Sequence, residues 1–117
     1  MTPSENDRRI DYIEFPARDL STTKAFYTSL FGWAFEDYGP EYTSFHDGRL
    51  AGVFFTSNDY GCGGPLVVIF ADDLELMKAN VLKLGAKLTK DIFEFPGGRR
   101  FQFLDPNGHE LSIWSNP

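Results

Sequence analysis

The 117-residue chain has 42% apolar residues, a net charge of −6 and one cysteine, Cys62. This length predicts one globular domain, and a lone cysteine excludes an internal disulfide framework. The scattered lysines and arginines argue against nucleic acid as a partner, and the longest apolar run, residues 66–71, is too short to span a bilayer. We therefore expect a cytoplasmic protein with neither a nucleic-acid nor a membrane partner.

A strand-helix pattern occurs twice along the chain. The stretches ARDLSTTKA (17–25) and ADDLELMKA (71–79) share five of nine residues, and each follows a β-like apolar run, residues 10–15 or 66–70. Apolar side chains then recur at three- and four-residue spacing, which predicts two amphipathic helices. Their expected buried residues are Leu20, Thr23, Phe26, Tyr27 and Leu30, and Leu74, Met77, Val81 and Leu84; their expected cap residues are Asp19 or Ser21, and Asp72 or Asp73.

Each helix is followed by a β-rich stretch with turn signals, residues 41–56 in the first half and 91–114 in the second. A segment rich in glycine and proline, residues 57–65, connects the halves. The pattern predicts an α+β domain in which each half is a strand, a helix and then two or three antiparallel strands; with three strands, the halves are two βαβββ modules. The expected ranges are 9–57 and 65–115 for the modules, 9–115 for the domain and 1–8 for a polar N-terminal tail.

The sequence RRFQFLDPNGHELSIW, residues 99–114, predicts a hairpin that turns at Asp105-Pro106-Asn107-Gly108. In this register Asp105 pairs with His109, and side chains alternate between the two faces of the hairpin. Neighbouring His109 and Glu110 then cannot form a dyad, and His109 is expected to be a solvated turn residue. The helix-facing side chains are Phe101, Phe103, Leu111 and Ile113, and the opposite face carries Arg100, Gln102, Leu104, Glu110, Ser112 and Trp114.

The duplicated modules, together with FYTSLFGW (26–33) and DPNGHELSIW (105–114), resemble the vicinal oxygen chelate superfamily. This superfamily includes glyoxalase I enzymes, extradiol dioxygenases and bleomycin-resistance proteins. The resemblance covers residues 9–115. It implies that the modules form a cup-shaped mixed β-sheet with the helices outside, and that the protein is a homodimer.

Metalloenzymes of this superfamily bind a divalent metal inside the cup through four strand residues. The resemblance places these ligand positions eight residues before each helix-start leucine and four residues after each turn glycine. The four positions hold Tyr12, Gly52, Leu66 and Ser112. Divalent metals prefer imidazole, carboxylate or thiolate donors, which this set lacks. We therefore expect no metal and no cofactor.

The expected pocket face combines the outer face of the hairpin with Tyr12 and Glu14. Arg100 and Trp114 are cross-strand partners, close enough for the guanidinium to stack on the indole. Either these two side chains hold a planar or anionic small molecule, or Arg100 pairs with Glu14 and Trp114 merely fills space. Phe54 matches Trp114 when the hairpins are aligned on their turn glycines. The candidate ligand-binding residues are Tyr12, Glu14, Phe54, Arg100, Gln102, Ser112 and Trp114.

Three functions are compatible with the sequence. The first is a small-molecule-binding protein of the bleomycin-resistance type that lacks the usual metal site. The second is a metal-independent lyase or isomerase of the glyoxalase type, with Glu14 as its candidate base. The third is a non-catalytic interaction subunit with a filled cup, which an open cavity would argue against. The acidic composition favours a cationic ligand whereas Arg100 favours an anionic or aromatic one, and both alternatives stay open.

Overall fold

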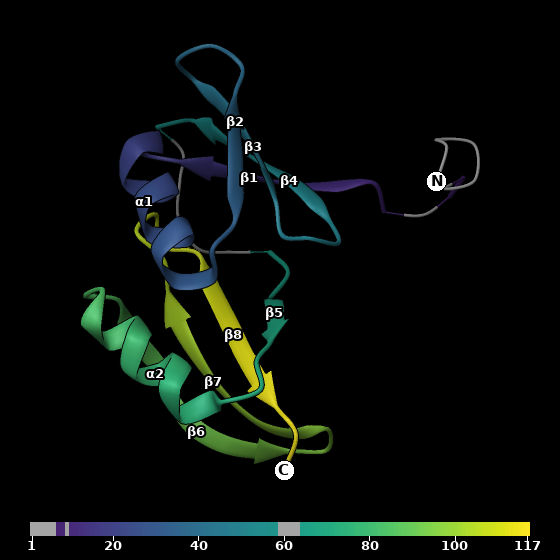
Figure 1. Ribbon diagram of the computed structural model, residues 1–117, viewed down its shortest axis with the longest axis vertical. Coiled ribbons are helices and arrows are strands. Elements are labelled where there is room, and N and C mark those ends of the chain that lie inside the picture. Colours follow the sequence, from purple (N-terminus) through teal and green to yellow (C-terminus); the bar gives the residue numbers. More distant parts are fainter. Residues whose placement is uncertain (1–6, 9, 59–63) are drawn as a thin grey trace. The chain divides into compact units, whose positions relative to one another are not determined.

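The computed structural model describes residues 7–8, 10–58 and 64–117 (Figure 1). The chain divides into two compact units, Met1–Tyr60 and Gly61–Pro117, and the division falls within the expected linker. Cys62, much of that linker and most of the expected N-terminal tail lie outside the described residues.

The first unit is a four-stranded mixed sheet with one helix (Figure 1). The strand order is β1-β4-β3-β2, in which β1 and β4 run parallel and the other pairs are antiparallel. The elements are β1 (Tyr12–Ala17), α1 (Leu20–Phe31), β2 (Ala34–Asp37), β3 (Tyr42–His46) and β4 (Ala51–Thr56).

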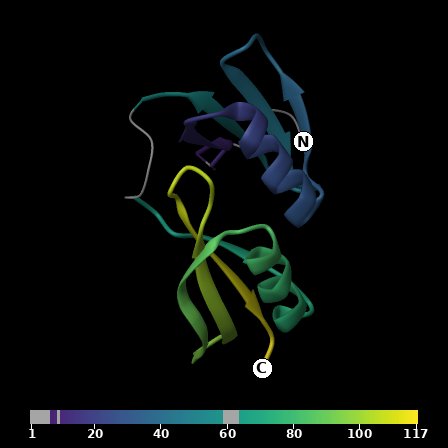
Figure 2. The same cartoon turned by 90° about the vertical axis from the view of Figure 1, so that its left-hand side faces the viewer.

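The second unit repeats this topology with the strand order β5-β8-β7-β6. Again the first strand of the unit runs parallel to the last, and helix α2 packs beside β6, β7 and β8 (Figure 2). The elements are β5 (Val67–Phe70), α2 (Leu74–Lys83), β6 (Lys87–Phe95), β7 (Gly98–Leu104) and β8 (Glu110–Ser115). The predicted α+β class and the two βαβββ modules are confirmed, although the described residues form two separate sheets instead of one continuous, closed cup.

Of the expected cap residues, Asp19 and not Ser21 caps the first helix, and Asp73 and not Asp72 caps the second. Asp19 accepts a hydrogen bond from the Thr22 amide at 3.3 Å, and Asp73 accepts one from the Leu76 amide at 3.0 Å. Leu84 is 39% exposed because it is the C-cap of α2, past the last turn that packs on the sheet. The expectation that Leu84 is buried is therefore wrong.

Each unit buries its own apolar core between the helix and one face of the sheet. In the second unit the four residues assigned to the helix side of the hairpin are at most 1% exposed, which confirms that they belong to the core. In the first unit the core is aromatic: the Trp33 ring stacks against Tyr27 of α1 at 4.9 Å and against Phe45 of β3 at 4.6 Å.

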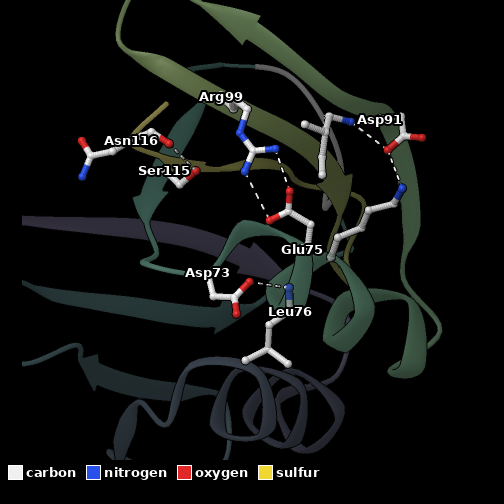
Figure 3. A network of polar contacts seen from close by, with 9 residues as sticks. Asp73, Glu75, Leu76, Asp91, Arg99, Ser115 and Asn116 are labelled. Carbon is white, nitrogen blue, oxygen red and sulfur yellow. Dashed lines mark hydrogen bonds and ion pairs between the residues drawn. The ribbon is translucent and has the colours of Figure 1, made fainter.

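Exposed ion pairs connect α2 to the adjacent hairpin (Figure 3). Arg99 of β7 binds both carboxylate oxygens of Glu75 at 2.7 and 3.2 Å, and Lys78 contacts Asp91 of β6 at 2.6 Å. Because Arg99 and Arg100 are neighbours in one strand, their side chains leave it on opposite faces. Arg99 therefore has a structural role at the helix, and Arg100 belongs to the other face.

Candidate functional site

The second hairpin has the predicted register. Arg100 lies opposite Trp114, and the Asp105 amide donates to the His109 carbonyl oxygen at 2.9 Å. The Asp105 carboxylate also accepts from the Asn107 and His109 amides, both at 2.8 Å, which ties the turn into a tight loop. Only 8% of His109 is exposed, so the expectation of a solvated histidine is wrong. The prediction assumed that a residue beside a turn is exposed to solvent, but His109 is buried.

Arg100 stacks on phenylalanines of β6. Its guanidinium carbon lies 5.1 Å from the ring centre of Phe93 and 4.9 Å from that of Phe95. Trp114 packs edge-to-face against Phe70 at 5.0 Å. The expected stacking of Arg100 on Trp114 is therefore replaced by stacking on Phe93 and Phe95. Register shifts on both sides of Lys90 bring Phe93 opposite Arg100, and such bulges leave no clear sequence signal.

Arg100 also borders a pocket of about 340 Å³ on the outer face of the second unit. The buried Nε atom of Arg100 has no hydrogen-bond partner among the described residues. A second cation is close by, because the Lys90 ammonium lies 5.6 Å from the centre of the Phe93 ring. The pocket is lined by Val68, Phe95, Gly97, Arg100 and Trp114.

Two other candidate residues of this face already have protein partners. Glu110 accepts hydrogen bonds from Thr89 at 2.6 Å and from Gln102 at 2.9 Å, and so connects β6, β7 and β8. The Ser112 hydroxyl is fully buried and donates to the Phe101 carbonyl at 3.0 Å. Of the four predicted hairpin residues, Arg100 and Trp114 line this pocket, whereas Gln102 and Ser112 do not.

The hydrogen bonds from Thr89 and Gln102 lower the pKa of Glu110 below its ordinary value of 4.5. The unfolded chain therefore binds this proton at a higher pH than the folded chain does. We expect the stabilisation to be complete above about pH 5 and to decline as the pH falls through 4.5 towards the folded pKa. Urea denaturation between pH 7 and 3 should show a shallower loss of stability for Glu110→Gln than for the parent, with exposed Glu41→Gln as the control. Equal pH dependence in parent and Glu110→Gln would contradict this assignment.

In the first unit, Tyr12 lines a cavity of about 420 Å³ on the outer face of the sheet. The neighbouring Glu14 carboxylate raises the pKa of Tyr12, because its negative charge and its accepting oxygens favour the protonated phenol. Glu14 itself is exposed, so burial does not single it out as a catalytic base. Arg100 belongs to the other unit, and its pairing with Glu14 stays a prediction.

Phe54 lies on the core face of the first sheet. Its ring is fully buried against Tyr27 of α1 and Phe15 of β1, at 5.1 and 5.2 Å, so its predicted place on the pocket face is wrong. The alignment on turn glycines fails because two residues, Arg49 and Leu50, separate Gly48 from the first paired residue of β4, whereas only His109 separates Gly108 from that of β8.

The strand registers show that the alignment of the two hairpins on their turn glycines is wrong by one residue. Phe55, and not Phe54, corresponds to Trp114, and Val53, and not Gly52, corresponds to Ser112. A Cβ atom at Gly52 would clash with the Phe45 ring, which places position 52 on the core side. The first-hairpin ligand position implied by the superfamily resemblance is therefore Val53.

The side chains at the implied ligand positions do not fit a divalent metal. With the corrected register they are Tyr12, Val53, Leu66 and Ser112, and the Ser112 hydroxyl is already engaged with a backbone carbonyl. Within the described residues, no three histidine, cysteine, aspartate or glutamate side chains come together as a possible metal site. His46 lies beside a turn, where its Nδ1 accepts from the Gly48 amide at 3.0 Å. We derive no metal-dependent step for this chain.

The family model for the Glyoxalase/Bleomycin resistance protein/Dioxygenase superfamily matches residues 9–113. The chain belongs to this superfamily. No curated protein matches it. Among the described residues, neither helix is long and apolar enough to cross a lipid bilayer.

Solved structures of the superfamily share the fold at low sequence identity. A glyoxalase-related enzyme from Fulvimarina pelagi is 19% identical, with a TM-score of 0.79 over 94% of this chain and 89% of its own. A family enzyme from Burkholderia phytofirmans PsJN is 20% identical, with a TM-score of 0.80 over 92% of this chain and 100% of its own. A variant of the fosfomycin resistance protein FosX from Listeria monocytogenes, complexed with Mn(II) and 1S,2S-dihydroxypropylphosphonic acid, is 15% identical, with a TM-score of 0.80 over 94% of this chain and 91% of its own.

Proposed function

We propose that this superfamily member binds a small anionic molecule with an aromatic or planar body and works without the usual divalent metal. The observation that carries the proposal is the buried, partnerless Nε of Arg100 at the edge of a pocket of about 340 Å³. A buried donor without a partner is costly, and an acceptor on a ligand would satisfy it.

The surroundings of Arg100 favour an anion. Stacking on Phe93 and Phe95 holds the guanidinium plane and leaves its edge free to bind a carboxylate or phosphonate in bidentate fashion. Lys90 adds a second positive charge over Phe93. Trp114 and Phe95 supply aromatic walls, so the pocket combines a charge that orients the ligand with apolar surface that buries it.

The other two functions have weaker support. A lyase or isomerase with Glu14 as base lacks the buried carboxyl that proton abstraction at neutral pH prefers, because Glu14 is exposed. An interaction subunit with a filled cup fits poorly with an open cavity in each unit. The homodimer and the cytoplasmic location stay predictions.

A thermal-shift screen tests the proposed ligand class. Small aromatic carboxylates and phosphonates should raise the melting temperature in proportion to the logarithm of their concentration, because a ligand of the folded state stabilises it by mass action. The matched neutral amides should have a much smaller effect. A screen in which only neutral compounds stabilise the protein would contradict the anionic assignment.

Removal of divalent metals provides a separate test. We expect the purified protein to contain no stoichiometric zinc, nickel, manganese or iron, because the four implied ligand positions offer only two hydroxyl groups. A chelator should leave its melting temperature and its binding of the aromatic carboxylates unchanged. Elemental analysis that finds about one metal ion per chain after dialysis would refute metal-independent function.

A further inference from the structure

The pocket faces of the two units correspond row by row. In the first sheet Glu36, Ser44, Val53 and Glu14 lie side by side across β2, β3, β4 and β1. The corresponding row of the second sheet is Lys90, Gln102, Ser112 and Val68. The second row therefore has no negative charge at these two positions. Lys90 stands where the first row has Glu36, and Val68 stands where it has Glu14.

The adjacent row shows the same change. Tyr42 lies opposite Phe55 on the first sheet, where the second sheet has Arg100 opposite Trp114. The cation that defines the pocket of the second unit is thus an aromatic phenol in the first. The two faces share a backbone frame but have opposite electrostatic character.

The cavity of about 420 Å³ in the first unit is lined by three tyrosines, Tyr12, Tyr38 and Tyr42. The rings of Tyr38 and Tyr42 lie edge-to-face, with centres 6.3 Å apart and an interplanar angle of 73°. Ala51 and Val53 add small apolar side chains from β4 to the lining of the cavity.

Carboxylates surround these rings. Asp11 lines the cavity, Glu14 lies near Tyr12, and Glu36 lies near Tyr38. The two glutamates raise the pKa of Tyr12 and of Tyr38, as expected where the local potential is negative. No lysine, arginine or histidine is among the described residues that line this cavity.

We propose that this cavity is a second binding site, specific for a small organic cation with an ammonium or quaternary ammonium group. The electron-rich faces of Tyr38 and Tyr42 attract the cation, and Glu36 supplies the compensating charge. Ligands of opposite charge then bind to different units of the chain, which reconciles the acidic composition with the unpaired Arg100.

Choline is a suitable probe because dimethylbutanol, in which carbon replaces the charged nitrogen, matches its shape without its charge. Methyl NMR of Ala51 and Val53, which line the cavity, should show saturable shifts with choline and much weaker ones with dimethylbutanol. Tyr42→Leu and Glu36→Gln should each weaken choline binding about threefold, the size expected for one cation–aromatic or exposed charge contact.

Two controls make the test decisive. Tyr42→Phe keeps the aromatic face and should retain the affinity for choline, which separates loss of the ring from loss of fold. Arg99→Ala removes a positive charge from the helix side of the other unit and should leave choline binding unchanged. Equal binding of choline and dimethylbutanol, unchanged affinity in Tyr42→Leu and Glu36→Gln, or the absence of methyl shifts at tens of millimolar choline would each overturn the proposal.

Discussion

Replacement of Phe54 with alanine is expected to lower the free energy of unfolding by about 3 to 5 kcal/mol, the usual range for a fully buried phenylalanine. Phe54 is completely inaccessible and contacts Tyr27, Phe15 and Phe45 with ring centres 5.1 to 5.3 Å apart. Its removal leaves a cavity among these closely packed rings, which can relax only in part.

Phe55→Ala is the matched control, because Phe55 is the next residue of β4, is only half-buried and leaves the strand on the opposite face. We expect it to cost only about 1 kcal/mol, as is typical of a partly exposed position. Urea denaturation followed by Trp33 fluorescence in a Trp114→Phe background reports on the first unit. If Phe55→Ala were the more damaging change, the register of the first hairpin would be wrong.

Arg100→Ala should weaken the binding of an aromatic carboxylate such as benzoate by about 1 to 3 kcal/mol, the size expected for a charge-assisted hydrogen bond lost from a partly buried site. The reason is the partnerless Nε of Arg100 beside a pocket that Trp114 also lines. Titration in a Trp33→Phe background leaves Trp114 as the only indole, so its quenching should report occupancy of this pocket.

Arg99→Ala provides the control for Arg100→Ala. It removes the same charge from the neighbouring residue, but the Arg99 side chain binds Glu75 of α2 on the opposite face. Benzoate affinity should therefore be nearly unchanged in Arg99→Ala and in His109→Ala. Equal losses in both arginine variants would indicate a general effect of net charge, and loss only in His109→Ala would move the site to the turn.

The fold could be predicted from sequence because its signals are local. Two copies of an Asp-Leu helix start predicted the two modules, and the caps at Asp19 and Asp73 were among the expected alternatives. The Asp105–Gly108 turn likewise determined the register of its hairpin, since a turn sets which residues pair on either side of it. The opposition of Arg100 and Trp114 followed from that register.

The surroundings of Arg100 could not be predicted in the same way. The bulges around Lys90 shift β6 against β7 and bring Phe93 and Phe95 beneath the guanidinium, and nothing in the sequence of β6 specifies where they occur. In the first unit the turn glycine lies one residue farther from the following strand than in the second, which moved Phe54 from the expected pocket face to the core. An error of one residue in the register is enough to assign a side chain to the wrong face, because side chains alternate between the faces with a period of two.

By itself, the sequence determined the two modules and the register of the second hairpin, because residue identity and nearest-neighbour geometry suffice for both. Only the tertiary structure decided which side chains meet on each face. Phe93, on which Arg100 stacks, lies on a different strand. The tyrosines of the first cavity come from β1, β3 and the segment between β2 and β3. Such contacts depend on loop lengths and bulges, which shift whole strands and are set by packing across the sheet.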